Sequence, residues 1–248
     1  MRIWPKIAAQ VVDTHCHLNL YADAQAQLAE FATRGTEIIA VTTSPEQYAA
    51  TAALARNAPS VHPAVGLIPQ EIRRLASQLH HLLTLLPDTR FVGEIGLDYV
   101  TQDKTERALQ RTVFARIVEA CSAQGDRVLS IHSRRATADT LAMLRDFSGT
   151  AILHWFSGSV REVEAADHVW FSINTAMVRS RRARSLIQAM NPDRILTETD
   201  GPFVTIGERP TTPRDIQLVL EYLAREWNCD LAESATRVRQ NYRRATGR

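Results

Sequence analysis

Short runs of aliphatic residues alternate with longer stretches of helical periodicity along the chain, and this alternation limits the possible folds more than any other feature. Eight of these runs are rich in Val and Ile and have the length of strands. They are Ala8–Val12, Glu37–Thr42, Val61–Val65, Phe91–Ile95, Val128–His132, Ala151–Leu153, Val169–Ile173 and Arg194–Thr197.

Helical periodicity fills the segments that follow these runs, namely Ala22–Thr33, Pro45–Arg56, Gln70–Leu86, Thr105–Gln124, Ala136–Arg145, Val160–Ala166, Arg181–Met190 and Pro213–Trp227. Strands that alternate with helices indicate a parallel sheet with crossover helices. Eight units predict an α/β protein of the (β/α)8 TIM barrel class, a single domain over residues 1–248 with Leu231–Arg244 as an extra C-terminal helix. An open doubly wound sheet is the alternative, but no glycine-rich turn follows the first predicted strand.

Charge and cysteine content limit the partners and the cellular compartment that we expect for this protein. The formal net charge of +2 is too small for nucleic-acid binding through the field of the whole protein, so any such binding needs a local site. Cys16, Cys121 and Cys229 are too few and too far apart for a disulfide framework. Because the sequence also shows no signal peptide and no membrane-spanning run, we expect a cytoplasmic protein without a membrane partner.

Histidines and acids gather where the predicted strands end. In barrel enzymes the carboxyl ends of the strands form the active-site face. Side chains alternate along a strand, so the two histidines of the first motif point the same way. The residues that meet at this face are His15, His17, Glu94, His132, His154 and Asp200.

Six such side chains exceed the needs of one metal ion. Imidazole together with carboxylate suits Zn, Mn, Fe or Ni, and carboxylates also accept Mg. The pattern therefore predicts a two-metal site bridged by a carboxylate. The remaining histidines, which are His62, His80, His81 and His168, are interpreted as structural or surface residues.

The motifs DTHCHL, GEIGLDY, IHSR, HWFSGS and TETDGPF, in this order, resemble those of the TatD family of metal-dependent deoxyribonucleases within the amidohydrolase-like barrels. The resemblance extends from Val12 to about Tyr242. It implies that one metal is held by the two histidines of DTHCHL, His15 and His17, and the other by His132 and His154. It further implies that Glu94 is the bridging carboxylate, and that Asp200 completes the first site and orients the attacking water.

The family implies hydrolysis of DNA phosphodiester bonds by two divalent cations, with Mg²⁺ or Mn²⁺ ahead of Zn²⁺, and trimming of single strands from the 3′ end. Asp13 and Glu198 each lie two residues before a predicted ligand, so their side chains point to the same side of the strand but deeper in the barrel. They are predicted to support the site from beneath. Arg134 is a candidate phosphate contact, its alternative being an ion pair on the rim. Trp155 is a candidate stacking partner for a base, its alternative being packing under the rim loops.

Three positions depart from the family pattern. Ile68 stands where a histidine is common, Trp155 where a cysteine is usual, and Gly201 where a serine is common. None of them removes a predicted ligand, so we expect the chemistry to survive while substrate handling differs. This divergence suggests a specialised member, such as the TatD-like component of the Qat anti-phage operons, with other defence-operon proteins as partners.

Arginines also cluster after the seventh predicted strand, at Arg179, Arg181, Arg182 and Arg184. They are either a track for a DNA backbone or a solvated helix face.

Two other functions stay open. A metal-dependent amidohydrolase or esterase of a small carbonyl substrate would use similar ligands. Such enzymes often carry a metal-bridging lysine, and neither Lys6 nor Lys104 ends a predicted ligand-bearing strand. The other possibility is a binding subunit that depends on partner proteins for its work.

Overall fold

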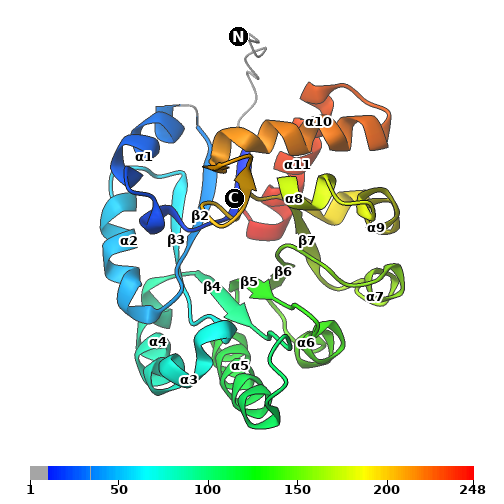
Figure 1. Cartoon of the computed structure of the whole chain (residues 1–248). Helices are drawn as coiled ribbons and strands as arrows, with labels where there is room; N and C mark the ends of the chain where they lie inside the picture. The colour runs from blue at the N-terminus through cyan, green and yellow to red at the C-terminus, as the bar shows by residue number, and fades with distance from the viewer. Residues whose placement is uncertain (1–10, 34) are drawn as a thin grey trace.

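The computed structural model describes residues 11–33 and 35–248 and shows eight parallel strands in a ring, with helices around the outside (Figure 1). Each strand pairs with its neighbour in sequence, from β1 to β8. The strands are β1 Val12–Cys16, β2 Glu37–Val41, β3 Val61–Val65, β4 Phe91–Gly96, β5 Val128–His132, β6 Thr150–Leu153, β7 Trp170–Ile173 and β8 Ile195–Thr197. The predicted (β/α)8 barrel is confirmed, and the open doubly wound alternative is wrong.

The α-helices follow the strands in the predicted order. They are α1 Ala24–Thr33, α2 Tyr48–Ala55, α3 Ile72–Leu75, α4 Leu79–Leu85, α5 Lys104–Gln124, α6 Thr137–Leu144, α7 Val160–Glu164, α8 Thr175–Val178, α9 Ala183–Ala189, α10 Ile216–Trp227 and α11 Leu231–Thr246. Short 3-10 turns flank several of them, for example η1 Leu18–Leu20 directly after the first strand. None of the helices in the described ranges is both long and apolar enough to cross a membrane.

The strands are buried on both faces, which explains their nearly continuous apolar sequences. Ile38 to Val41 of β2 are at most 1% exposed. Parallel strands covered by an outer layer of helices have this composition because neither face meets water.

The first strand begins later than its apolar run predicts. It spans Val12–Cys16 rather than Ala8–Val12, and residues 8–10 lie outside the described residues. Polar residues such as Thr14 can lie in a buried strand here because the neighbouring strand β8 supplies their partners. The Thr14 hydroxyl donates to Thr197 O at 3.2 Å, and the Thr197 hydroxyl donates to Val12 O at 2.5 Å.

Two small elements after β7 and β8 were not predicted. Helix α8 is capped by Asn174, whose side chain accepts from the Met177 amide at 2.9 Å. A hairpin of β9 Thr205–Ile206 and β10 Arg209–Pro210 follows the last barrel strand. Both are too short to leave a periodic pattern in the sequence.

The predicted extra helix is α11, which packs against α10 and β8. A capping box between Asp230 and Glu233 fixes its start. Its buried Asn241 amide donates to Pro192 O at 2.8 Å and to Ile195 O at 2.7 Å, at the point where β8 begins. This helix therefore supports the last strand of the barrel.

Replacing Asn241 by Ala should lower the free energy of unfolding by about 1–3 kcal/mol, because the buried carbonyl of Ile195 and the partly buried carbonyl of Pro192 lose their donor. Denaturant unfolding would measure this change. Gln240→Ala, at an exposed position of the same helix, is the control and should stay within about 0.5 kcal/mol of the wild type. Equal stabilities for the two variants would contradict the role given to Asn241.

Candidate metal centre

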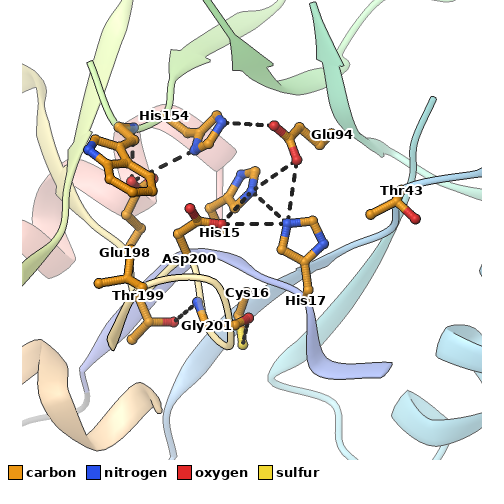
Figure 2. Close-up of polar contacts among 12 residues, drawn as sticks. His15, Cys16, His17, Thr43, Glu94, His154, Glu198, Thr199, Asp200 and Gly201 are labelled. Carbon is orange, nitrogen blue, oxygen red and sulfur yellow. Dashed lines mark hydrogen bonds and ion pairs between the residues drawn. The ribbon is translucent and has the colours of Figure 1, made fainter. Parts of the chain in front are cut away.

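The structure brings the six predicted ligands together at the carboxyl ends of five barrel strands, and Figure 2 shows five of the six ligands converging. All six have little or no contact with solvent. They lie in, or at most three residues after, β1, β4, β5, β6 and β8, and are His15 and His17, Glu94, His132, His154 and Asp200 in that order.

Two irregularities in strand pairing lie at this site. The register of β1 on β2 shifts between Asp13 and Cys16, and that of β4 on β5 shifts between Val92 and Ile95. These shifts bracket His15 and Glu94 respectively. Bulges of this kind occur beside active sites, where they re-aim a side chain out of the regular alternation.

The first group consists of His15, His17 and Asp200. The Nε2 atoms of the two histidines are 3.2 Å apart, and each lies 3.5 Å from Asp200 Oδ1. The backbone holds this arrangement, because the Asp200 amide donates to His15 O at 2.8 Å and the His17 amide donates to Gly201 O at 2.9 Å. The strand ends that carry these ligands are thus tied to each other directly.

The second group consists of Glu94, His132 and His154. Glu94 Oε1 lies 2.8 Å from His132 Nδ1 and 3.0 Å from His154 Nε2, and the two imidazole nitrogens are 3.2 Å apart. The other oxygen, Glu94 Oε2, faces the first group, 3.4 Å from His17 Nε2 and 3.8 Å from His15 Nε2. One carboxylate therefore offers one oxygen to each pair of histidines.

This donor set fits divalent cations. Two imidazole nitrogens that are 3.2 Å apart would repel each other through their lone pairs. Either a proton on one of them or a metal ion bound to both removes this repulsion. The ring nitrogen on the far side of His15, Nδ1, lies 2.7 Å from the Ser130 hydroxyl, so this residue can keep its Nε2 lone pair for a metal. Two cations would be held by the two groups, with Glu94 shared between them.

The ionisation of the site reflects the closeness of its charges. Burial alone would raise the pKa of Glu94, but attraction to His154 and hydrogen bonds from the surrounding imidazoles hold this pKa well below its usual value. Burial would lower the pKa of His17, yet its hydrogen bonds with Asp200 and Glu94 raise it to about 9. Burial and repulsion from His154 hold the pKa of His15 well below normal. Metal binding to His17 must therefore displace a proton, whereas Glu94 and His15 are already in the forms that bind a metal.

Asp98 belongs to the site and was not among the predicted residues. Its Oδ2 lies 2.9 Å from His132 Nε2, on the side of the ring opposite Glu94, while Oδ1 accepts from the Val100 amide at 2.8 Å. Burial would raise the pKa of Asp98, but the hydrogen bond from His132 outweighs this and lowers it. The sequence carried one signal, since Asp98 lies in the motif GEIGLDY four residues after Glu94.

Asp13 and Glu198 are fully buried, as predicted from their parity, but neither makes a hydrogen bond to an imidazole. Asp13 accepts from the Thr199 amide at 3.0 Å, from its hydroxyl at 2.6 Å and from the His15 amide at 3.3 Å. It therefore fastens β1 to the segment after β8. Burial raises the pKa of Asp13 to about 7 even though these hydrogen bonds oppose the change.

Glu198 also lies within reach of His15 and His154 and forms a third possible ligand group with them. Its oxygens are already engaged, because Oε1 accepts from the Trp155 amide and the Asn174 side chain, both at 2.8 Å, and Oε2 accepts from the Ser172 hydroxyl. Burial, reinforced by repulsion from Asp200, raises the pKa of Glu198 well above normal. These contacts favour a supporting role over metal ligation.

The predicted substrate residues lie at the rim. Arg134 is exposed two residues after His132, and Trp155 is 39% exposed directly after His154. Two of the four arginines after β7 are engaged in contacts with other loops. Arg179 donates to Thr205 O at 2.8 Å, and Arg182 donates to Gly158 O. This arrangement does not match a continuous track for a DNA backbone.

The structure gives a physical reason for two departures from the family pattern. A Cβ atom on Gly201 would lie 1.9 Å from the Tyr21 hydroxyl, which donates to Thr211 O at 2.5 Å, so a serine cannot fit here while Tyr21 keeps its position. Ile68 is buried in the apolar core. Gln70, two residues after Ile68, does reach the second group, since its amide nitrogen lies 3.3 Å from His132 Nε2.

Comparison with known proteins identifies the family to which the chain is similar. The chain matches the TatD related DNase family over residues 12–247. It is 29% identical over 245 residues to the uncharacterized metal-dependent hydrolase YjjV of Escherichia coli K12, a match that covers 90% of this chain and 93% of that protein. It is 28% identical over 191 residues to the 3′-5′ ssDNA/RNA exonuclease TatD of Pantoea vagans, covering 71% of this chain and 70% of that protein.

Solved structures show the same fold. The crystal structure of the TatD homologue YjjV from Escherichia coli K12 matches with a TM-score of 0.87 at 24% identity, over 97% of this chain and 99% of that chain. A TatD family hydrolase from Entamoeba histolytica matches with a TM-score of 0.81 at 16% identity, over the same shares of the two chains. Since the family match spans nearly all of the described residues, the chain belongs to the TatD family of metal-dependent hydrolases.

Proposed function

We propose that this hydrolase is a deoxyribonuclease that uses two divalent cations, Mg²⁺ or Mn²⁺ ahead of Zn²⁺, to cut phosphodiester bonds near the 3′ end of single strands. The position of Glu94 carries this proposal. Each of its oxygens faces a separate pair of histidines, which is the arrangement expected of a carboxylate shared by two cations. Two adjacent cations suit an in-line displacement at phosphorus, where charge on several oxygens must be stabilised at once.

When bound, the cations supply positive charge to the phosphate and acidify a water molecule. The chain's own residues complete the reaction. Asp200 presents Oδ1 to the histidines of the first group, which leaves Oδ2 to orient the attacking water and take its proton. Asp98 holds the ring of His132 so that Nδ1 faces Glu94. Asp13 keeps the backbone of His15 fixed to the segment that carries Asp200.

The proposed substrate follows from what the site offers around its metal ligands. Arg134 is exposed at the rim and is suited to a phosphate contact through its planar guanidinium. Contacts to phosphate do not distinguish bases, so sequence specificity should be low. The relative from Pantoea vagans is named a 3′-5′ ssDNA/RNA exonuclease, which supports the polarity and the preference for single strands.

The alternatives find less support. Lys104 lies exposed at the start of α5, and Lys6 is outside the described residues, so the described chain offers no lysine to bridge metals as in many carbonyl hydrolases. A partner-dependent subunit would have little use for a complete set of ligands. Association with other defence-operon proteins stays a prediction from the sequence.

Replacing Asp200 by Asn should lower kcat on single-stranded DNA by at least about 100-fold, because the amide cannot accept the proton of the attacking water. The assay uses metal-stripped protein supplied again with Mn²⁺ and oligonucleotides labelled at the 3′ or the 5′ end. His80→Ala, on the exposed face of α4, is the matched control and should cut like the wild type. Near-normal cutting by Asp200→Asn would contradict the general-base role, and failure of the wild type to cut any oligonucleotide would contradict the proposed function.

Replacing Asp98 by Asn should weaken binding at the second group by about 10- to 100-fold, because the amide nitrogen would oppose the N–H of His132 and favour the wrong tautomer. Calorimetric titration of the metal-stripped protein with Mn²⁺ would measure the affinity. Asp139→Asn is the control, since this carboxylate accepts from Tyr99 and does not contact a predicted ligand. Unchanged Mn²⁺ affinity in Asp98→Asn would remove Asp98 from the site.

A further inference from the structure

The exposed large apolar side chains of the described residues are not scattered over the surface. There are four of them: Leu20 at 38%, Val100 at 41%, Trp155 at 39% and Phe203 at 57% exposure. Each lies within three residues of a side chain of the metal centre, namely His17, Asp98, His154 and Asp200 in that order. All four therefore belong to loops at the carboxyl ends of the barrel strands. Apolar groups that gather around a polar site in this way mark a surface that binds a ligand with apolar faces.

Phe203 is placed over the first group of ligands. Its ring meets that of His17 edge to face, with centroids 4.8 Å apart and an interplanar angle of 82°. The backbone fixes the residue, because the Phe203 amide donates to Asp200 O at 2.9 Å. More than half of the side chain is nevertheless open to solvent. One side of the ring is thus supported by the metal centre, while the rest remains available to a ligand.

Trp155 is placed beside the second group of ligands. Its φ of 39° lies in the left-handed region, which an indole-bearing residue adopts only when its surroundings impose it. The constraint comes from Glu198 Oε1, which accepts from the Trp155 amide at 2.8 Å and is itself held by Asn174. A buried carboxylate thus holds the backbone of an exposed tryptophan next to the ligand His154.

We propose that Trp155 and Phe203 are stacking platforms for two unpaired bases, one on each side of the phosphate that reaches the metal centre. This inference rests on the proposed function. The ring of Phe203 lies against His17 of the first group, and Trp155 directly follows His154 of the second group in the chain, so the two aromatic residues belong to different halves of the centre. Every base has a π-face, so stacking adds affinity without reading sequence.

This arrangement specifies the substrate more closely. A duplex hides the faces of its bases within the stack, whereas a single strand or a frayed end presents them. The substrate is therefore a strand with at least two unpaired nucleotides around the scissile bond, and its bases as well as its phosphates contribute to binding. Val100, which has no π-system, should contribute little to this recognition.

The test compares kcat/KM for a single-stranded oligothymidylate with that for an oligonucleotide of equal length made of abasic residues. Wild-type protein loaded with Mn²⁺ should favour the oligothymidylate by about 30-fold or more, because each of the two stacked bases contributes about 5- to 100-fold. Trp155→Leu and Phe203→Leu should each lower this preference by about 5- to 100-fold, through slower cutting of the oligothymidylate more than of the abasic strand. Trp155→Phe and Phe203→Tyr should retain it, because both keep an aromatic ring.

Val100→Ala is the matched control, since it trims an equally exposed apolar side chain of the same rim and should leave the preference unchanged within about twofold. An equal loss on both strands in the leucine variants would show a structural role and overturn the inference. So would a wild type that cuts both strands at the same rate. A wild type that cuts neither strand would instead overturn the proposed function, so the two failures are distinguishable.

Discussion

The junction between β8 and β1 is the feature on which the rest of this molecule depends. It brings the two ends of the eight-stranded order together, and threonine hydroxyls of both strands bond to carbonyls across it. Beyond the strands, the same junction continues as backbone hydrogen bonds from Asp200 to His15 and from His17 to Gly201. Since these are the residues that form the first group of ligands, the barrel cannot close without assembling half of the metal centre.

Glu94 joins the second half to the first. It lies on β4, across the barrel from the junction, and it divides its two oxygens between the histidine pairs. Gly96 allows β4 to continue close to β5, because its φ is 136° and a Cβ atom there would lie 2.1 Å from His132 O. A glycine in this position is needed for the strand that carries Glu94 to approach the strand that carries His132.

Much of the fold and of the ligand set was predictable because both depend on short-range rules. Strand-like runs and helical periodicity predicted the barrel, and the alternation of side chains along a strand predicted that His15 and His17 point to the same side. Asp98 was missed because its role depends on which side of the His132 ring it meets, and this is a tertiary contact. The end of β1 was predicted too early, at Val12, because Asp13 and Thr14 are polar, and only their partners in the segment around β8 explain their burial.

The departures from the family pattern also required the structure. Gly201 is explained by the hydroxyl of Tyr21, which is distant in sequence, and Trp155 is held by the buried carboxylate of Glu198. Both changes lie around the metal centre and leave its predicted ligands intact, so the prediction that they alter the handling of substrate stays a prediction.

Anomalous X-ray diffraction from crystals equilibrated with Mn²⁺ would test the shared-carboxylate centre most directly. Our account predicts two anomalous peaks in each chain, one at His15, His17 and Asp200 and one at His132 and His154, with Glu94 contacting both. A single peak, or a peak held by Glu198 in place of Glu94, would contradict it.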